Sequence, residues 1–240
     1  MTIAGRGYNS WDWPIAGQSA LSVSVGKVLR VLPQASGETF FTSSGIGGIW
    51  AVGSDGLIQR ENTTGLRGIT RIDTTDGGRL FGHLTGAEVS ELQPDATRSL
   101  IRFAGEARTG LWGDGGPATD AFIWRVQDVA VDSIGNLYVP EGIMHKVRVV
   151  LPTGTISTFA GTRDIGVDGD GGPATQARIA CPTRVDVGPQ FDVYFDYPHG
   201  MRHVNPAGTI TSWPSTTSWC SSSSGCPGDG QPTARSILCG

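Results

Sequence analysis

The sequence has little of the positive charge that binds a phosphate backbone. Lys27 and Lys146 are its only lysines, and 18 cationic residues face 22 acidic ones, for a formal net charge of −4. Nucleic-acid-binding domains instead gather Lys and Arg on one face or along one groove. We therefore expect no nucleic-acid partner.

Long apolar runs are also missing. A helix that crosses a bilayer needs about 18 or more consecutive apolar residues, and the sequence contains no such run. Residues 1–5 have neither the charged n-region nor the apolar h-region of an export signal. We expect no membrane span, and an exported protein would need a signal outside these residues.

Turn-forming residues, by contrast, are abundant. The chain of 240 residues contains 36 Gly and 14 Pro, with 38% hydrophobic residues. Glycine supplies positive φ and proline pre-sets φ in turns, so this composition fits short strands joined by tight turns. The length suits one repeat domain with a sizeable core.

One segment is repeated without change. Gly113–Thr119 and Gly169–Thr175 both read Gly-Asp-Gly-Gly-Pro-Ala-Thr, and residues 228–232 carry a partial third copy. Self-similarity at this period indicates an array of like modules. Between the copies, short alternating or β-branched segments punctuated by glycine are typical of half-buried strands.

These patterns predict four sets of four strands. The third set is the clearest, and the other three follow the same order of segments. The predicted strands are 29–32, 37–41, 48–52 and 55–58; 69–73, 78–81, 87–92 and 99–105; 129–132, 135–139, 145–148 and 154–161; 184–187, 192–196, 201–204 and 208–213. Residues 11–16 stand roughly where the repeated motif precedes the later sets.

The repeated motif and these segments resemble the NHL-repeat family of β-propellers, especially extracellular bacterial-type repeats with a Gly-Asp-Gly-Gly-Pro-Ala insertion before each blade. The resemblance implies an all-β fold, a propeller of about four four-stranded blades. It does not imply an activity, because this fold carries many functions. The expected propeller covers 1–213, with repeats at about 16–64, 65–105, 106–161 and 162–213. Residues 214–240 form a Cys/Ser-rich tail.

The two ends carry fragments of a further blade. Thr2, Ile3, Ala4 and Gly5 resemble the closing strand 158–161 but have no repeat before them. An unpaired sheet edge is a site for pairing with another chain. Either the terminal strands complete a ring within one chain, or they add to neighbouring copies in an open-ended assembly.

Four cysteines favour an oxidising compartment, and we expect an extracellular or cell-surface location. An even cysteine count beside a Ser/Thr-rich tail favours two disulfides. We favour Cys220–Cys226 and Cys181–Cys239, with free thiols or zinc as the alternatives. Asn62, in Asn-Thr-Thr, would carry an N-linked glycan in an exported chain.

Tryptophan is frequent, with seven residues. Trp112 lies beside the first copy of the motif, and Trp11 and Trp13 lie in the corresponding N-terminal segment. Exposed, they would stack on sugar rings or anchor a protein partner. Buried, they would fill space between blades.

The candidates for catalysis or metal binding have simpler interpretations. Asp114 and Asp170 suit a structural turn better than a calcium loop, which needs more oxygen ligands and a distal Glu. His145 and His199 match in two repeats, each with an Arg three residues later, and in the family such residues brace a corner. No Gly-x-Ser-x-Gly motif, Cys–His couple or regularly spaced carboxylate pair is present.

We therefore expect a non-enzymatic extracellular propeller without cofactors or metals. Its most plausible role is that of a self-assembling subunit of a surface structure or filament, which pairs with other copies of itself through its terminal strands. The alternative is a glycan-binding, lectin-like propeller. A metal-dependent propeller lyase or hydrolase ranks third.

Overall fold

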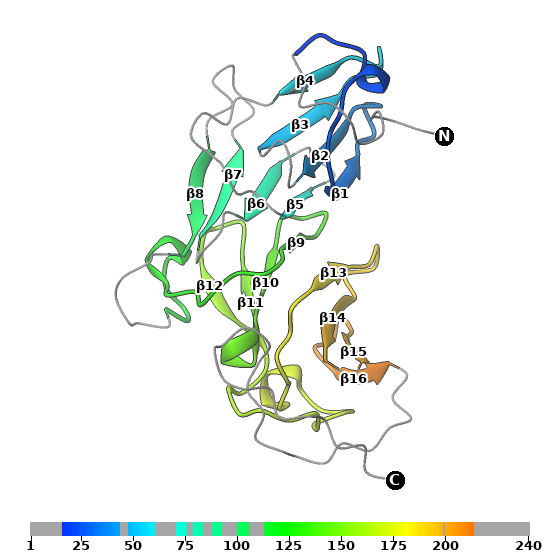
Figure 1. Cartoon of the computed structure of the whole chain (residues 1–240). Coiled ribbons are helices and arrows are strands. Elements are labelled where there is room, and N and C mark those ends of the chain that lie inside the picture. Colours follow the sequence, from blue (N-terminus) through cyan, green and yellow to red (C-terminus); the bar gives the residue numbers. More distant parts are fainter. Residues whose placement is uncertain are drawn as a thin grey trace, which may run out of the picture. The chain divides into compact units, whose positions relative to one another are not determined.

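The computed structural model describes residues 16–43, 48–60, 71–75, 79–83, 88–92, 100–105, 113–198 and 200–213. Within them the chain forms four antiparallel four-stranded sheets, joined strand to strand in chain order (Figure 1). The only helices of the described residues are 3-10 turns. They are η1 (Ala20–Ser22), η2 (Ala118–Asp120), η3 (Gly142–Met144) and η4 (Ala174–Gln176).

Each sheet is one blade, and the blades follow one another along the chain. Blade 1 contains β1 (Val28–Pro33), β2 (Thr39–Ser43), β3 (Ile49–Val52) and β4 (Ile58–Arg60). Blade 2 contains β5 (Arg71–Thr74), β6 (Leu80–His83), β7 (Val89–Leu92) and β8 (Leu100–Ala104). Blade 3 contains β9 (Ala130–Val131), β10 (Leu137–Glu141), β11 (Lys146–Val150) and β12 (Ile156–Ala160). Blade 4 contains β13 (Val185–Val187), β14 (Val193–Tyr197), β15 (Gly200–Val204) and β16 (Ile210–Trp213).

The predicted fold class is confirmed. The protein is all-β, and its four sheets are four-stranded blades of the β-propeller type. Each of the sixteen predicted segments overlaps a strand, with ends that shift by up to three residues. The largest shift is at 55–58, which begins on turn residue Asp55 and meets β4 only at Ile58, and segments that begin on a turn glycine such as Gly135 (φ 92°) also start early.

The chain divides into two compact units, Met1–Phe103 and Ala104–Gly240. The first unit holds blades 1 and 2, and the second holds blades 3 and 4. No helix of the described residues has the length and apolar character needed to cross a membrane.

The repeated motif extends the outer edge of its own blade. The N–H of Gly115 donates to the carbonyl of Ile156 on β12 (2.8 Å), and the N–H of Ile156 donates to the carbonyl of Gly116 (3.0 Å). Gly171, Gly172 and Ile210 make the same two bonds in blade 4. The motif therefore acts as a short fifth segment that ties the start of each blade to its last strand.

In blade 1 a different segment does this work. The N–H of Gly17 donates to the carbonyl of Ile58, and the N–H of Ile58 donates to the carbonyl of Gln18. Residues 17 and 18 are thus the equivalents of Gly115 and Gly116. The predicted placement of this segment at 11–16 was too early, because Trp11–Ile15 shares only an Asp and a Pro with the motif and gave a false register.

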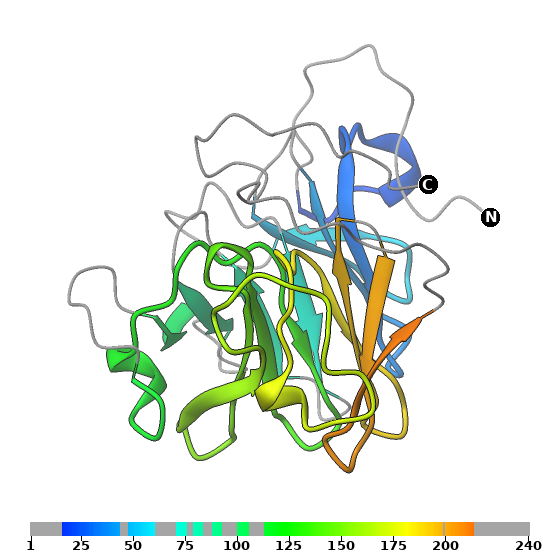
Figure 2. The same cartoon turned by 90° about the horizontal axis from the view of Figure 1, so that it is seen from below.

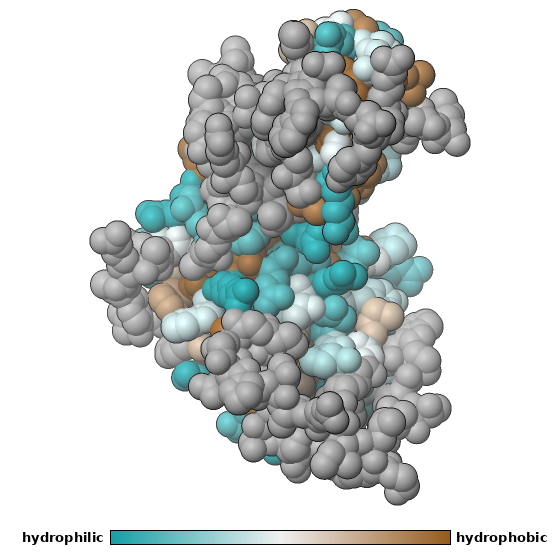
Figure 3. Space-filling view, in the orientation of Figure 1, coloured by the Kyte–Doolittle hydropathy of each residue, from teal (hydrophilic) through white to brown (hydrophobic). Residues whose placement is uncertain are grey.

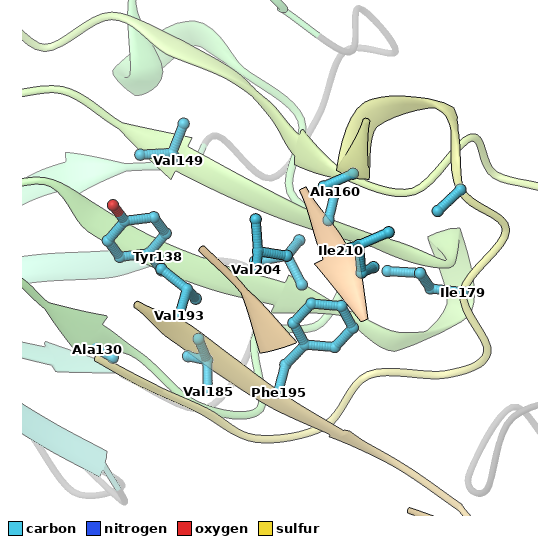
Figure 4. Packing of buried hydrophobic residues seen from close by; sticks show 13 residues of the cluster. Ala130, Tyr138, Val149, Ala160, Ile179, Val185, Val193, Phe195, Val204 and Ile210 are labelled. Atoms are coloured by element: carbon cyan, nitrogen blue, oxygen red, sulfur yellow. The ribbon is translucent and has the colours of Figure 1, made fainter. Parts of the chain in front are cut away.

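Blades 3 and 4 pack face to face through a continuous core (Figure 4). Tyr138 from blade 3 lies beside Val193 from blade 4, and both belong with Val149 and Phe195 to one cluster of buried side chains. The ring of Phe159 meets that of Tyr138 edge-on, with centroids 4.9 Å apart. Burial of these alternating side chains is the main force that holds the two blades together, at about 25 cal/mol per Å² of apolar surface.

Blades 1 and 2 share a second core, which comprises Phe40, Ile49, Ala51, Ile72, Leu80 and Leu92. A third cluster covers the opposite face of blade 1. There the segment Ala20–Val25 packs on Phe41, Trp50 and Ile58.

Two glycines of blade 3, Gly154 and Gly161, differ in how closely other atoms pack around them. Both Gly154 (φ +83°) and Gly161 (φ +94°) have left-handed backbone, but an added Cβ meets nothing within 4 Å at Gly154 and lies 2.2 Å from the His145 carbonyl oxygen at Gly161. We predict that Gly154→Ala costs about 1 kcal/mol, from backbone strain alone. Gly161→Ala should cost about 3 kcal/mol or more, because strain and overpacking add. Denaturant unfolding measures both, and equal losses would contradict the described contact.

Candidate functional site

The two Asp residues of the motif hold buried arginines. Arg148 lies on β11 with its side chain 1% exposed, and its guanidinium forms an ion pair with Asp114. Thr158 on β12 donates to the other oxygen of Asp114 (2.7 Å). The motif turn, the third strand and the fourth strand of blade 3 therefore meet at one carboxylate.

Blade 4 repeats this arrangement. Arg202 on β15, also 1% exposed, lies 2.6 Å from Asp170. The N–H of Ser212 donates to the second oxygen of Asp170 (3.0 Å), and the Arg202 guanidinium also donates to the carbonyls of Asp168 (3.2 Å) and Arg178 (3.4 Å). A buried guanidinium needs such a set of acceptors, because an unpaired buried charge is strongly destabilising.

Blade 1 replaces both members of the pair. Strand register places Trp50 opposite Phe41, as Arg148 lies opposite Val139. The position of the motif Asp, one residue before Gly17, is Ala16. An apolar indole thus occurs with Ala, whereas a guanidinium occurs with Asp, which indicates that the Asp is present to neutralise the Arg.

This role extends the interpretation drawn from the sequence. The motif Asp does belong to a structural turn, but its main partner is an Arg far along the chain, which spacing alone did not identify. The available signal was the joint occurrence of Asp114 with Arg148 and Asp170 with Arg202 in the two best-matched repeats. Both oxygens of each Asp accept hydrogen bonds within the blade.

Blade 3 carries a second buried acid, Glu141, at the end of β10. It is fully buried, lies 3.3 Å from Arg148, and accepts a hydrogen bond from the backbone N–H of Trp124 (2.8 Å). Burial raises the pKa of Glu141, and the opposing charge of Arg148 acts against that rise. Tyr197 in blade 4 and Ser43 in blade 1 occupy the same register position, so neither of these blades has the carboxylate.

His145 lies on the loop that follows Glu141. Its Nδ1 accepts the backbone N–H of Cys181 (3.3 Å), which favours a neutral ring that carries its proton on Nε2. Burial lowers the pKa of His145, and the nearby charge of Asp164 acts in the opposite direction. His145 is therefore held neutral at pH 7 and braces the loop against the next blade.

Three of these loop residues have strained backbone. Arg125 (φ 48°), His145 (φ 52°) and Cys181 (φ 41°) are left-handed although none is glycine. Cys181 is equivalent to Arg125 in the repeat, and it contacts His145. Such strain persists only where surrounding contacts enforce it, and it is frequent at functional sites. The loop end of blades 3 and 4, defined by Trp124, Arg125, Glu141, His145 and Cys181, is the candidate site.

The outer face of blade 4, turned away from blade 3, is a second polar region. In blade 3 and in blade 4, four residues that lie opposite one another across the four strands form a row on one face. In blade 3 this row packs against blade 4, whereas the equivalent row of blade 4 is polar. The blade 3 row is Ala130, Tyr138, Val149 and Ser157. The blade 4 row is Asp186, Tyr194, His203 and Thr211. The visible surface over β13 and β14 is teal to white in Figure 3.

Within this row the side chains form a connected set. His203 Nε2 lies 2.5 Å from Asp192 Oδ1, and its Nδ1 lies 3.3 Å from Thr211 Oγ1. The Tyr194 ring stacks on the imidazole with centroids 4.9 Å apart. The four strands that carry these residues lie side by side from yellow to orange in Figure 2.

Most residues singled out from the sequence lie outside the described residues. Cys181 is described: its residue is 2% exposed, and it takes part in a disulfide whose partner is not among the described residues. The pairing of Cys181 and the other cysteines stays a prediction. The predicted site residues that lie outside the described residues are Cys220, Cys226, Cys239, Asn62, His199, Trp11, Trp13, Trp112 and the predicted strand Thr2–Gly5. In the described part of the chain, no group of three or more His, Cys, Asp or Glu could hold a metal ion.

No known protein-family model matches the sequence, and no curated protein matches it. Solved structures do resemble it. Virginiamycin B lyase from Staphylococcus aureus has 14% identity and a TM-score of 0.53, over 82% of this chain and 59% of that one. An auxiliary nutrient binding protein from Bacteroides ovatus has 17% identity and a TM-score of 0.55, over 80% and 48%. Nidogen, in a nidogen/laminin complex, has 14% identity and a TM-score of 0.54, over 78% and 62%.

These likenesses show the β-propeller fold alone, since all identities are low. The lyase and nidogen are six-bladed propellers. The chain spans about half to three fifths of the length of the structures that it resembles.

The role of the Asp170–Arg202 ion pair can be tested by replacing both residues with the types found at the same positions in blade 1, Ala and Trp. We predict that Asp170→Ala costs about 2 kcal/mol of unfolding free energy, because Arg202 stays buried with only two backbone carbonyls as acceptors, while the 46% exposure of Asp170 keeps the loss below that of a fully buried pair. Adding Arg202→Trp should recover at least half of the loss. Asp168→Ala is the matched control, since its partner Arg178 is half exposed and such pairs contribute less than about 1 kcal/mol. Denaturant unfolding measures all three variants. If the double variant is the least stable, the Asp is not present to neutralise the Arg.

The lowered pKa of His145 predicts a pH dependence of stability. As pH falls below the ordinary value of 6.5, the unfolded chain binds a proton before the folded one does. The free energy of unfolding should therefore fall between about pH 7 and pH 5, and His145→Gln should flatten that part of the profile. Unfolding at several pH values measures this, and parallel profiles would show that His145 does not contribute.

Proposed function

We propose that this chain is a non-catalytic binding and structural module of the extracellular NHL-repeat type, which assembles with other copies of itself. The observation that carries the proposal is the use of the repeated charges. The two ion pairs hold the motif turn to the third strand inside blades 3 and 4. They are Asp114–Arg148 and Asp170–Arg202. The repeat thus builds a framework and leaves recognition to loops, blade faces and terminal segments.

Exposed apolar side chains on β1, the edge strand of blade 1, support assembly. Val31 on β1 is 46% exposed, whereas the equivalent Val185 on β13 is 3% exposed because blade 3 covers it. Val28 on the same strand is 40% exposed. An apolar inter-blade position left open in this way fits a partner segment, and the terminal strand Thr2–Gly5 of another copy is the partner that we propose.

Binding of glycans is the second candidate. Exposed Trp124 at the loop end of blade 3 favours it, since an indole presented to solvent can stack on a sugar ring. The nutrient-binding propeller from Bacteroides ovatus shows that a similar fold serves binding, and the lyase shows that it also serves catalysis. Metal analysis of the purified protein separates our proposal from a metal-dependent enzyme, because a stoichiometric metal would favour the latter.

Assembly can be tested at the open blade. We predict that deletion of residues 1–6 abolishes assembly and leaves a folded monomer, as measured by light scattering and circular dichroism. Val31→Glu should weaken assembly as well, because it places a charge on the proposed contact.

Leu151→Glu is the control, since Leu151 is similarly exposed (39%) at a turn of blade 3. Particle sizes that stay unchanged on deletion of residues 1–6 would refute assembly through the N-terminal strand.

A further inference from the structure

Trp124 is presented to solvent between two anchors. Its neighbours Ile123 and Val126 are 0% and 2% exposed, whereas Trp124 itself is 42% exposed. Its ring meets the edge of Phe122, with centroids 5.4 Å apart. The indole therefore stands out from a segment whose flanks are fixed in the core.

The backbone at Trp124 is also fixed. Its N–H donates to Glu141 Oε1 at 2.8 Å, and the next residue, Arg125, is left-handed with φ of 48°. Glu141 in turn contacts Arg148, so the hydrogen bond connects the tryptophan to the ion pair with Asp114. A large exposed aromatic thus rests on a rigid support.

The fold itself does not require this arrangement. The repeat places Ala180, which is 5% exposed, at the position of Trp124 in blade 4. Tyr197 takes the position of Glu141 there, and the blade forms without the carboxylate. Burying a carboxylate costs free energy unless it is well paired. Blade 3 has therefore acquired both the exposed aromatic and the costly acid that fixes it.

We propose that Trp124 is the stacking platform of a saccharide-binding site at the loop end of blade 3, with Glu141 as its positioning residue. This inference rests on the glycan binding proposed above as the second candidate, and adds the residue that positions the platform and the kind of sugar that it takes. The apolar face of a pyranose ring packs on an exposed indole, and a rigid platform loses little entropy on binding.

The surroundings of Trp124 favour a neutral sugar over other partners. Near it in sequence, the half-exposed Phe122 supports the edge of the indole, and the polar Arg125 and Gln127 offer hydrogen-bonding groups. A protein hot spot needs a buried patch of about 800 Å² per partner around it, whereas one sugar ring needs only the indole and a few hydrogen-bonding groups. With a net charge of −4 and two lysines in the sequence, phosphorylated or sulfated ligands are disfavoured.

The test uses the full chain on an array of neutral oligosaccharides, followed by calorimetric titration with the strongest hit. We expect binding that Trp124→Ala weakens by about tenfold or more, and that Trp124→Tyr largely keeps, because a smaller aromatic platform remains. Ile134→Ala is the control for an exposed apolar side chain at a turn of the same blade (62% exposed).

Two substitutions of Glu141 test its positioning role. Glu141→Gln keeps an acceptor oxygen for the Trp124 N–H and should retain most of the affinity, whereas Glu141→Leu should lose it. The chemical shift of the Trp124 amide follows the hydrogen bond directly. Equal affinities for the Gln and Leu variants would refute the positioning role.

Array binding that is absent, or that Trp124→Ala leaves undiminished, would overturn the saccharide site. Light scattering on the same samples separates this outcome from the assembly proposal. Trp124→Ala should leave the particle size unchanged, while deletion of residues 1–6 should change it.

Discussion

A buried guanidinium on the third strand, neutralised by the carboxylate of the motif turn, is the contact on which blades 3 and 4 depend. Arg148 and Arg202 lie inside their blades, where an unpaired charge would be strongly destabilising. Each Asp can reach its Arg only when the motif is hydrogen-bonded to the outer strand of the same blade. The ion pair therefore couples the first segment of a blade to its last two strands.

This coupling explains why the seven-residue motif is repeated without change while the strands vary. A strand needs only alternation and volume, and many apolar residues satisfy both. The motif must instead provide two left-handed glycines, such as Gly113 (φ 73°) and Gly115 (φ 85°), and one carboxylate at a fixed point. Blade 1 lacks the Asp and has Trp50 in place of the Arg, so a blade can also form with an apolar side chain at this position.

The sequence was sufficient to predict the sixteen strands and the fold class, because alternation and glycine punctuation are local signals. It was not sufficient to predict the partner of Asp114, since the contact with Arg148 joins distant segments and depends on the strand register. The burial of Glu141 has no local signal either, because an acid at the end of a strand is ordinarily exposed and only the strand register places this one beside Arg148. Trp124 was counted among seven tryptophans, and only its 42% exposure separates it from those that fill space.

The exposed surfaces of blades 1 and 4 differ in a way that limits how copies can join. Asp186 occupies in blade 4 the position that Ala130 occupies in the apolar face of blade 3, and Asp192 pairs with His203 in the same blade. Blade 1 offers the apolar Val31 on its edge strand β1. A dry contact between these two surfaces would bury carboxylates against an aliphatic side chain, at a cost of several kcal/mol each. Joining through an added strand avoids that cost, because the strand pairs by backbone hydrogen bonds along the edge strand β1 and can place its own apolar side chains beside Val31, while the carboxylates of blade 4 stay in water.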